Sequence, residues 1–134
     1  MSYMPRGYQK TATTVYLMNY HFAWIPKYRR KVLTGKLAER LEQLIYEKAQ
    51  QLECKVIQLR IMPDHVHLFI EGNPKLSPNR IIGEIKGYTS RVLRREFPEL
   101  LKMPTLWTRS YFVSTAGNVS SQVIEQYIEA QKGM

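Results

Sequence analysis

The stretch MPDHVHLFIE, residues 62–71, combines a turn with a strand whose two faces differ in character. Pro63 and Asp64 are typical of a tight turn, and the residues after them favour an extended conformation. Because side chains alternate along a strand, His65 and His67 share one face, while the other face is mostly apolar and suited to a core. Two imidazoles about 7 Å apart at Cα can close on a single metal ion. The stretch therefore predicts half of a metal site.

On both sides of this strand, the sequence predicts further strands and helices. Strands are expected where β-branched and aromatic residues gather, and helices where apolar residues recur at helical spacing. One helix has a clear start, because Ser77 is a good N-cap and Pro78 suits a first turn. The other expected elements are a strand at 13–25, a helix at 35–53, a strand at 55–61, the helix that starts at Pro78 and runs to 96, a strand at 106–113 and a last helix that Ser120 or Ser121 caps and that ends at Gln131.

The order β-α-β-β-α-β-α is that of a ferredoxin-like α+β sandwich. Such a fold has an antiparallel sheet with helices on one face, and here a C-terminal helix follows it. The 134 residues leave room for one core, and they show no internal repeat or low-complexity tract. We therefore expect a single domain at 13–134 after a loose arm at 1–12, with 114–118 as a flexible hinge before the last helix.

The chain is strongly basic. Its 20 lysines and arginines against 11 aspartates and glutamates give a formal charge of +9, which favours a polyanionic partner such as nucleic acid. The apolar runs are too short to span a bilayer, and the first ten residues lack the apolar core of a secretory signal. The single Cys54 cannot form an internal disulfide, which fits a reducing compartment. These features predict a cytoplasmic protein with no membrane partner.

The last helix carries polar residues in a register that suits a site. Tyr127 and Gln131 are four residues apart and lie on one face, and Glu125 points elsewhere. Ile124 and Ile128, on the neighbouring face, can anchor the helix to a hydrophobic surface. If the Gln131 amide oxygen completed a metal site begun by the two histidines, the Tyr127 hydroxyl would lie beside the metal.

That geometry suits phosphodiester chemistry. A metal polarises the scissile phosphate and neutralises the charge that develops in the transition state. Tyrosine, with an ordinary pKa of about 10, becomes an effective nucleophile when a nearby cation helps it to lose its proton. A phosphotyrosine ester stores the energy of the broken bond, so cleavage and rejoining would need no ATP.

Four segments, in this order, resemble the single-tyrosine HUH transposases, the TnpA type that moves minimal bacterial and archaeal insertion sequences. MPDHVH at 62–67 resembles the HUH motif, in which U is a bulky apolar residue, and YIEAQ at 127–131 resembles the tyrosine helix. YHFAWIPKYRR at 20–30 and LWTRSYFV at 106–113 are also similar to this family. The resemblance covers about residues 13–131, nearly the whole chain.

The resemblance implies a specific activity. It makes Tyr127 the nucleophile and His65, His67 and Gln131 the ligands of Mg²⁺ or Mn²⁺. It implies binding of single-stranded DNA ends that fold into hairpins, and cleavage to a 5′-phosphotyrosine with a free 3′-OH. It also implies a homodimer, in which the tyrosine helix can complete the partner subunit's site, in the cytoplasm of a bacterium or archaeon.

Two groups of cations are candidate DNA contacts. Residues 27–31, KYRRK, are the densest cationic run, and an unpaired base can stack on Tyr28 while phosphates meet the cations. In the helix at 78–96, three arginines from Arg91 onward form a positive patch, with Lys86 further up. The expected contacts are Arg29, Arg30, Lys31 and Arg91.

Three other functions remain open from the sequence. A related tyrosine enzyme that processes repeated palindromes would keep the chemistry without the mobile element, although the compact length and the Tyr127-x-x-x-Gln131 ending favour the transposon form. A non-enzymatic RNA- or DNA-binding domain would explain the charge but leave the histidine and tyrosine registers as coincidence. A metal-dependent phosphodiesterase that uses water would not need Tyr127.

Overall fold

The structure, a computed structural model, describes residues 8–11, 15–115 and 121–131. Its strands are β1 (Gln9–Lys10), β2 (Val15–Tyr16), β3 (Asn19–Trp24), β4 (Lys55–Met62), β5 (His65–Glu71) and β6 (Phe112–Ser114). Its helices are α1 (Gly35–Gln51), α2 (Pro78–Glu96) and α3 (Ser121–Ala130), with two 3₁₀ turns, η1 (Lys27–Arg29) and η2 (Pro98–Lys102). The main sheet has the order β4-β5-β3-β6 with antiparallel neighbours, and β1 pairs with β2 separately.

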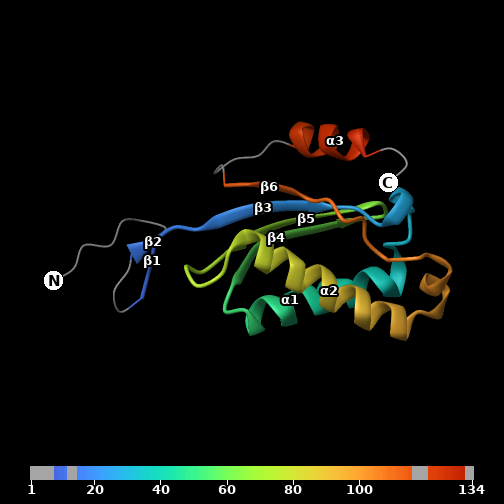
Figure 1. Cartoon of the computed structure of the whole chain (residues 1–134), viewed down its shortest axis with the longest axis horizontal. Helices are drawn as coiled ribbons and strands as arrows, with labels where there is room; N and C mark the ends of the chain where they lie inside the picture. The colour runs from blue at the N-terminus through green and yellow to red at the C-terminus, as the bar shows by residue number, and fades with distance from the viewer. Residues whose placement is uncertain (1–7, 12–14, 116–120, 132–134) are drawn as a thin grey trace.

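Helices cover both faces of the main sheet. Figure 1 shows α1 and α2 side by side against one face and α3 against the other. The larger core lies under α1 and α2, where Phe22, Trp24 and Leu68 of the sheet are fully buried. A second, small cluster holds α3 to the opposite face. This confirms the expected α+β sandwich with an antiparallel sheet, and it places the C-terminal helix across the sheet from the other two.

Local sequence signals account for several element boundaries. The helix expected at 78–96 has these bounds in the structure, and the Ser77 hydroxyl accepts a hydrogen bond from the Arg80 amide at 3.1 Å. Pro63 and Asp64 form the turn between β4 and β5, as expected. These features depend on neighbouring residues, so sequence reasoning can find them.

The strand expected at 13–25 is divided. β3 begins at Asn19, and Val15–Tyr16 belongs instead to the short ribbon with β1. Residues 12–14 lie outside the described part of the chain. Of the arm expected at 1–12 only 8–11 are described, and the hinge expected at 114–118 is described only as far as 115. Ser120, one of the two possible N-caps of the last helix, also lies outside it.

The strand expected at 106–113 is mostly wrong, because only Phe112–Ser114 pairs with β3. Trp107 makes an isolated bridge to Pro26, and its indole N–H donates to the Thr89 hydroxyl at 3.1 Å. The carbonyls of the next three residues accept hydrogen bonds from the Lys86 ammonium at 2.7, 3.4 and 3.1 Å. Lys86 of α2 therefore takes the carbonyls of residues 108–110, while the Leu106 carbonyl and the Thr108 amide still pair with the backbone of Lys27 and Ile25.

In the described part of the chain, no helix is long and apolar enough to cross a lipid bilayer.

Candidate functional site

The two predicted histidines lie where the alternation along β5 places them. Their side chains face α3 and are half-buried, whereas Val66, Leu68 and Ile70 point into the larger core and are fully buried. β5 is an inner strand between β4 and β3, so its backbone is fixed on both sides. The histidine face is therefore a rigid platform for binding.

A cleft of about 400 Å³ opens over this platform at the β4 side of the sheet. Its floor includes His65 and His67, and its wall is part of α3. The other lining residues are Gln58, Arg60 and Met62 of β4 and Ile124 and Glu125 of α3. The cleft has a volume that can admit a nucleotide and combines imidazoles, a cation and a carboxylate.

The orientation of the His65 ring is set by the residue before it. The His65 Nδ1 atom is 2.9 Å from Oδ1 of Asp64. Because an ionised carboxylate can only accept, Nδ1 carries the proton and Nε2 carries the lone pair. Nε2 is therefore the nitrogen of His65 that could bind a metal ion.

His67 contacts the third histidine of the chain, which sequence reasoning missed. His21 of β3 is 5% exposed, stacks on Phe69 with ring centroids 4.0 Å apart, and places Nδ1 3.2 Å from Nε2 of His67. Burial lowers the pKa of His67, and its neighbours His21 and Arg60 lower it further. The His67 ring is therefore neutral over a wider pH range, as metal ligation requires. The sequence shows a histidine within the strand expected at 13–25. That this histidine pairs with β5, however, depends on the register between two distant segments.

Tyr127 of α3 and Gln131, which directly follows the end of the helix at Ala130, lie on the same side, as predicted, but this side meets Ser110 and β6 rather than the cleft. The Tyr127 hydroxyl donates to Oγ of Ser110 at 3.3 Å, and that hydroxyl donates to Oε1 of Gln131 at 3.2 Å. The Tyr127 ring packs on Phe112 with centroids 5.8 Å apart. Burial raises the pKa of Tyr127, so in this position the phenol keeps its proton.

Helix geometry explains why the two halves of the predicted site are separate within one chain. Ile124 and Ile128 are buried against Ala23 and Ile25, which confirms their predicted role as anchors. Residues one position before and one position after such a stripe lie about 100° to either side of it. Tyr127 therefore falls on the β6 side, and Glu125 falls on the cleft side. Glu125 thus points away from the face of Tyr127, as expected, and lines the cleft.

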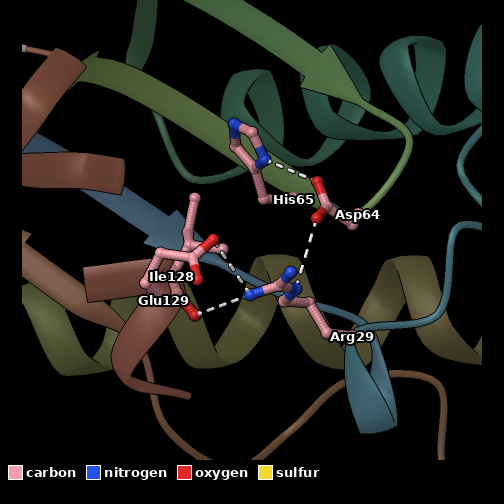
Figure 2. Close-up of polar contacts among 5 residues, drawn as sticks. All are labelled: Arg29, Asp64, His65, Ile128 and Glu129. Atoms are coloured by element: carbon pink, nitrogen blue, oxygen red, sulfur yellow. Dashed lines mark hydrogen bonds and ion pairs between the residues drawn. The ribbon is translucent and has the colours of Figure 1, made fainter. Parts of the chain in front are cut away.

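Arg29 joins the histidine platform to α3 (Figure 2). Its Nε atom is 3.4 Å from Oδ2 of Asp64, and its Nη1 atom is 3.4 Å from both the Ile128 carbonyl oxygen and Oε1 of Glu129. The sequence suggested a DNA contact for Arg29, and in the structure its guanidinium already has three partners within the protein.

The other predicted DNA contacts are on two sides of the molecule. Arg30 and Lys31 are exposed after β3, and the Arg30 guanidinium is 5.8 Å from the centre of the half-exposed Tyr28 ring. Arg91 is exposed on α2, in the helical layer across the sheet from α3, with its guanidinium 5.7 Å from the Tyr88 ring. Lys86 does not belong to that surface patch, since burial lowers its pKa to about 8 and three carbonyls bind its ammonium.

The residues that could hold a metal are the two histidines of the cleft. Within 8–11, 15–115 and 121–131, no group of three or more histidine, cysteine, aspartate or glutamate side chains is arranged to hold a metal ion. The third ligand predicted from the sequence, Gln131, is a glutamine whose amide oxygen contacts Ser110. Gln131 would join the two histidines only with a different placement of α3 or from a second chain.

Comparison with known proteins adds relatives along nearly the whole sequence. The profile of the family described as Transposase IS200 like matches residues 14–131. The chain is 32% identical to the ISDra2 transposase TnpA of Deinococcus radiodurans over 131 residues, 96% of this chain and 94% of that protein. It is 28% identical to the transposase for insertion sequence element IS200 of Salmonella typhimurium, over 90% of this chain and 80% of that protein.

Two solved structures have a similar fold. The crystal structure of a candidate transposase from Deinococcus radiodurans R1 matches with a TM-score of 0.87 and 33% identity, and covers 94% of this chain and 99% of that one. A REP-associated tyrosine transposase bound to a REP hairpin matches with a TM-score of 0.57 and 15% identity, over 96% of this chain and 69% of that one.

Proposed function

The chain belongs to the family of IS200-like transposases, and from this premise we propose that it cuts and rejoins single-stranded DNA through Tyr127. The observation that carries the proposal is the pair His65 and His67, side by side in a cleft large enough for a nucleotide. The anchored His65 ring and the neutral His67 ring support a role for both as metal ligands.

The chemistry of the donor set supports a divalent metal. His65, His67 and Gln131 would hold Mg²⁺ or Mn²⁺, and the ion would polarise the scissile phosphate and offset the charge of the transition state. Imidazole nitrogens favour a transition ion, so we expect this set to prefer Mn²⁺ over Mg²⁺. The ligands come from β5 and from α3, which makes the placement of α3 decisive.

Tyr127 is the proposed nucleophile. Its oxygen would attack the phosphorus of the scissile phosphodiester, lose its proton, and form a 5′-phosphotyrosine while the 3′ oxygen leaves as a hydroxyl. Rejoining reverses these steps, with a 3′-OH as the attacking group. Against Ser110 the phenol is half-buried and holds its proton, so the reactive tyrosine would occupy a different environment.

A second copy of the chain would supply that environment. β4 forms one edge of the sheet, and three cleft residues, Gln58, Arg60 and Met62, belong to it. Two chains paired along β4 would bring their clefts close together, and the α3 of each could then reach the histidines of the other. We therefore propose a homodimer with shared active sites.

The proposed partner is single-stranded DNA with hairpin ends. The net charge of +9 supports a nucleic-acid ligand, and Lys31, Arg30 and the exposed Tyr28 together offer cations for phosphates and a ring for base stacking. A protein of this fold has been solved with a nucleic-acid hairpin. A bacterial or archaeal cytoplasm is the proposed location for this activity.

A covalent-adduct assay tests the proposal. The protein is incubated with hairpin-bearing single-stranded DNA and Mn²⁺, denatured, and resolved by electrophoresis. We expect a DNA adduct with the wild-type protein, none with Tyr127→Phe, and none in the presence of EDTA. Tyr46→Phe, on the outer surface of α1, is the matched control and should keep the adduct. An adduct that survives Tyr127→Phe would reject the nucleophile, and cleavage without an adduct would favour a water-using phosphodiesterase.

A further inference from the structure

Arg29 is held in place by an unusual backbone conformation. Tyr28 and Arg29 have φ angles of 60° and 52°, the left-handed region that side chains other than glycine rarely adopt. Hydrogen bonds fix the segment, from the Lys27 amide to the Leu106 carbonyl at 2.7 Å and from the Arg29 amide to the Pro26 carbonyl at 2.8 Å. Such strain persists only where the surroundings impose it, and it is often found at functional sites. The segment aims the Arg29 side chain between β5 and α3.

One end of the guanidinium acts on the histidine. The Asp64 carboxylate is shared, since Oδ2 is 3.4 Å from Arg29 Nε while Oδ1 accepts from His65 Nδ1 at 2.9 Å. The Arg29 and Asp64 side chains are only 30% and 20% exposed. Because Arg29 restrains the carboxylate, it also restrains the ring and the tautomer of His65.

The other end of the guanidinium holds the last turn of α3. Nη1 is 3.4 Å from the Ile128 carbonyl oxygen, which also accepts a hydrogen bond from the backbone N–H of Gln131. A cation at a helix C-terminus interacts favourably with the carbonyls there. The contact with Glu129 is weaker, because that carboxylate is 66% exposed. Ile128 directly follows Tyr127, so Arg29 touches the backbone next to the proposed nucleophile.

We propose that Arg29 is a positioning residue that couples the docking of α3 to the orientation of the His65 ring. Through one planar side chain, the position of the tyrosine-bearing helix affects the histidine that would bind the metal. The inference rests on the proposed function only in taking His65 as a ligand. The coupling itself is a property of the protein without metal or DNA.

Two measurements on the free protein test the coupling. The ¹⁵N chemical shifts of the His65 ring report its tautomer, and amide hydrogen exchange of residues 125–130 reports the docking of α3. In Arg29→Ala we expect His65 to lose its single Nδ1–H form and the α3 amides to exchange about threefold to tenfold faster. Arg29→Lys keeps the charge but lacks the fork, so it should show both changes to a smaller degree. The lysine variant decides the question if the alanine variant does not fold.

Two control variants sharpen the result. Arg40→Ala removes a 2.8 Å ion pair with Glu96 in the other helical layer and should change neither readout. Glu129→Gln removes only the exposed partner and should leave the His65 shifts unchanged. If Arg29→Ala changes one readout without the other, or neither, the coupling is refuted. The Arg29 variants could change both readouts as expected while the wild-type protein forms no DNA adduct. That result would refute the proposed function and leave the role of Arg29 intact.

Discussion

At the scale of single residues, the two cleft histidines have different environments. His65 is oriented by an anionic acceptor, Asp64, whereas His67 lies half-buried against another imidazole, His21. The first arrangement favours one tautomer, and the second favours the neutral ring. Both effects are compatible with the proposed role of the two residues as metal ligands, although their contacts differ.

Lys86 supports the positions of Tyr127 and Gln131 indirectly, through the segment that these two residues contact. It fixes the carbonyls of residues 108–110, and Ser110 in turn contacts both Tyr127 and Gln131. The folded chain releases the Lys86 proton near pH 8, and the unfolded chain near 10.5. Between these values the unfolded state binds more protons, so the free energy of unfolding rises with pH.

Lys86→Met removes this titration. The stability of the wild-type protein relative to the variant should therefore increase from pH 8 to 10.5, by at most about 3 kcal/mol and less where the ammonium still touches water. Urea unfolding of both proteins across this pH range measures the difference. A difference independent of pH would show that the three carbonyls keep the ammonium charged throughout.

At the scale of elements, α3 depends on a small contact with the sheet. Among the residues of α3 whose burial is described, Ile124 and Ile128 are buried and pack on Ala23 and Ile25, with Tyr127 and Phe112 at the side. Truncating a buried isoleucine to alanine costs about 2–5 kcal/mol. Because the contact is small, we expect the loss to open α3 locally and leave the sheet folded.

The corresponding prediction concerns Ile124→Ala. Hydrogen exchange of the α3 amides should become at least about tenfold faster, while β3 and β5 keep their protection. Val123→Ala is the matched control, because this neighbour in the same helix is 42% exposed. Equal exchange rates in the two variants, or loss of protection throughout the sheet, would contradict local docking through Ile124.

The elements also show what a sequence can reveal and where it fails. α2 was predicted with its true bounds because Ser77 and Pro78 are local signals, and the histidine face of β5 followed from simple alternation. The strand expected at 106–113 is mostly absent because Lys86, distant in sequence, binds the carbonyls of residues 108–110. Helical spacing predicts that Tyr127 and Gln131 lie on the same side, but which part of the sheet this side contacts depends on tertiary packing.

At the scale of the whole molecule, the separation of Tyr127 from the histidines bears on assembly. Within one chain Glu125 lines the cleft, and Tyr127 contacts Ser110. Turning α3 about its axis would expose its buried isoleucines, which makes a simple rotation costly. If two chains exchange their α3 helices, each helix can present a different face to the cleft. We therefore expect Tyr127 of one chain to attack DNA in the site formed by the histidines of its partner.

Mixing two inactive variants tests this expectation. Tyr127→Phe keeps the histidine pair, and His67→Ala keeps the tyrosine. If each site takes its tyrosine from the partner, a mixed dimer has one site with both parts. Random pairing then restores about a quarter of the wild-type adduct.

The two chains are refolded together, and adducts with single-stranded DNA are quantified against each variant alone. As the matched control, Tyr127→Phe is mixed with a variant that carries both Tyr127→Phe and His67→Ala. This mixture contains no Tyr127 and should remain inactive. A mixture with no more adduct than its components would instead place the tyrosine in the same chain as the histidines it serves, and α3 would then have to leave its contact with Ser110 before each cleavage.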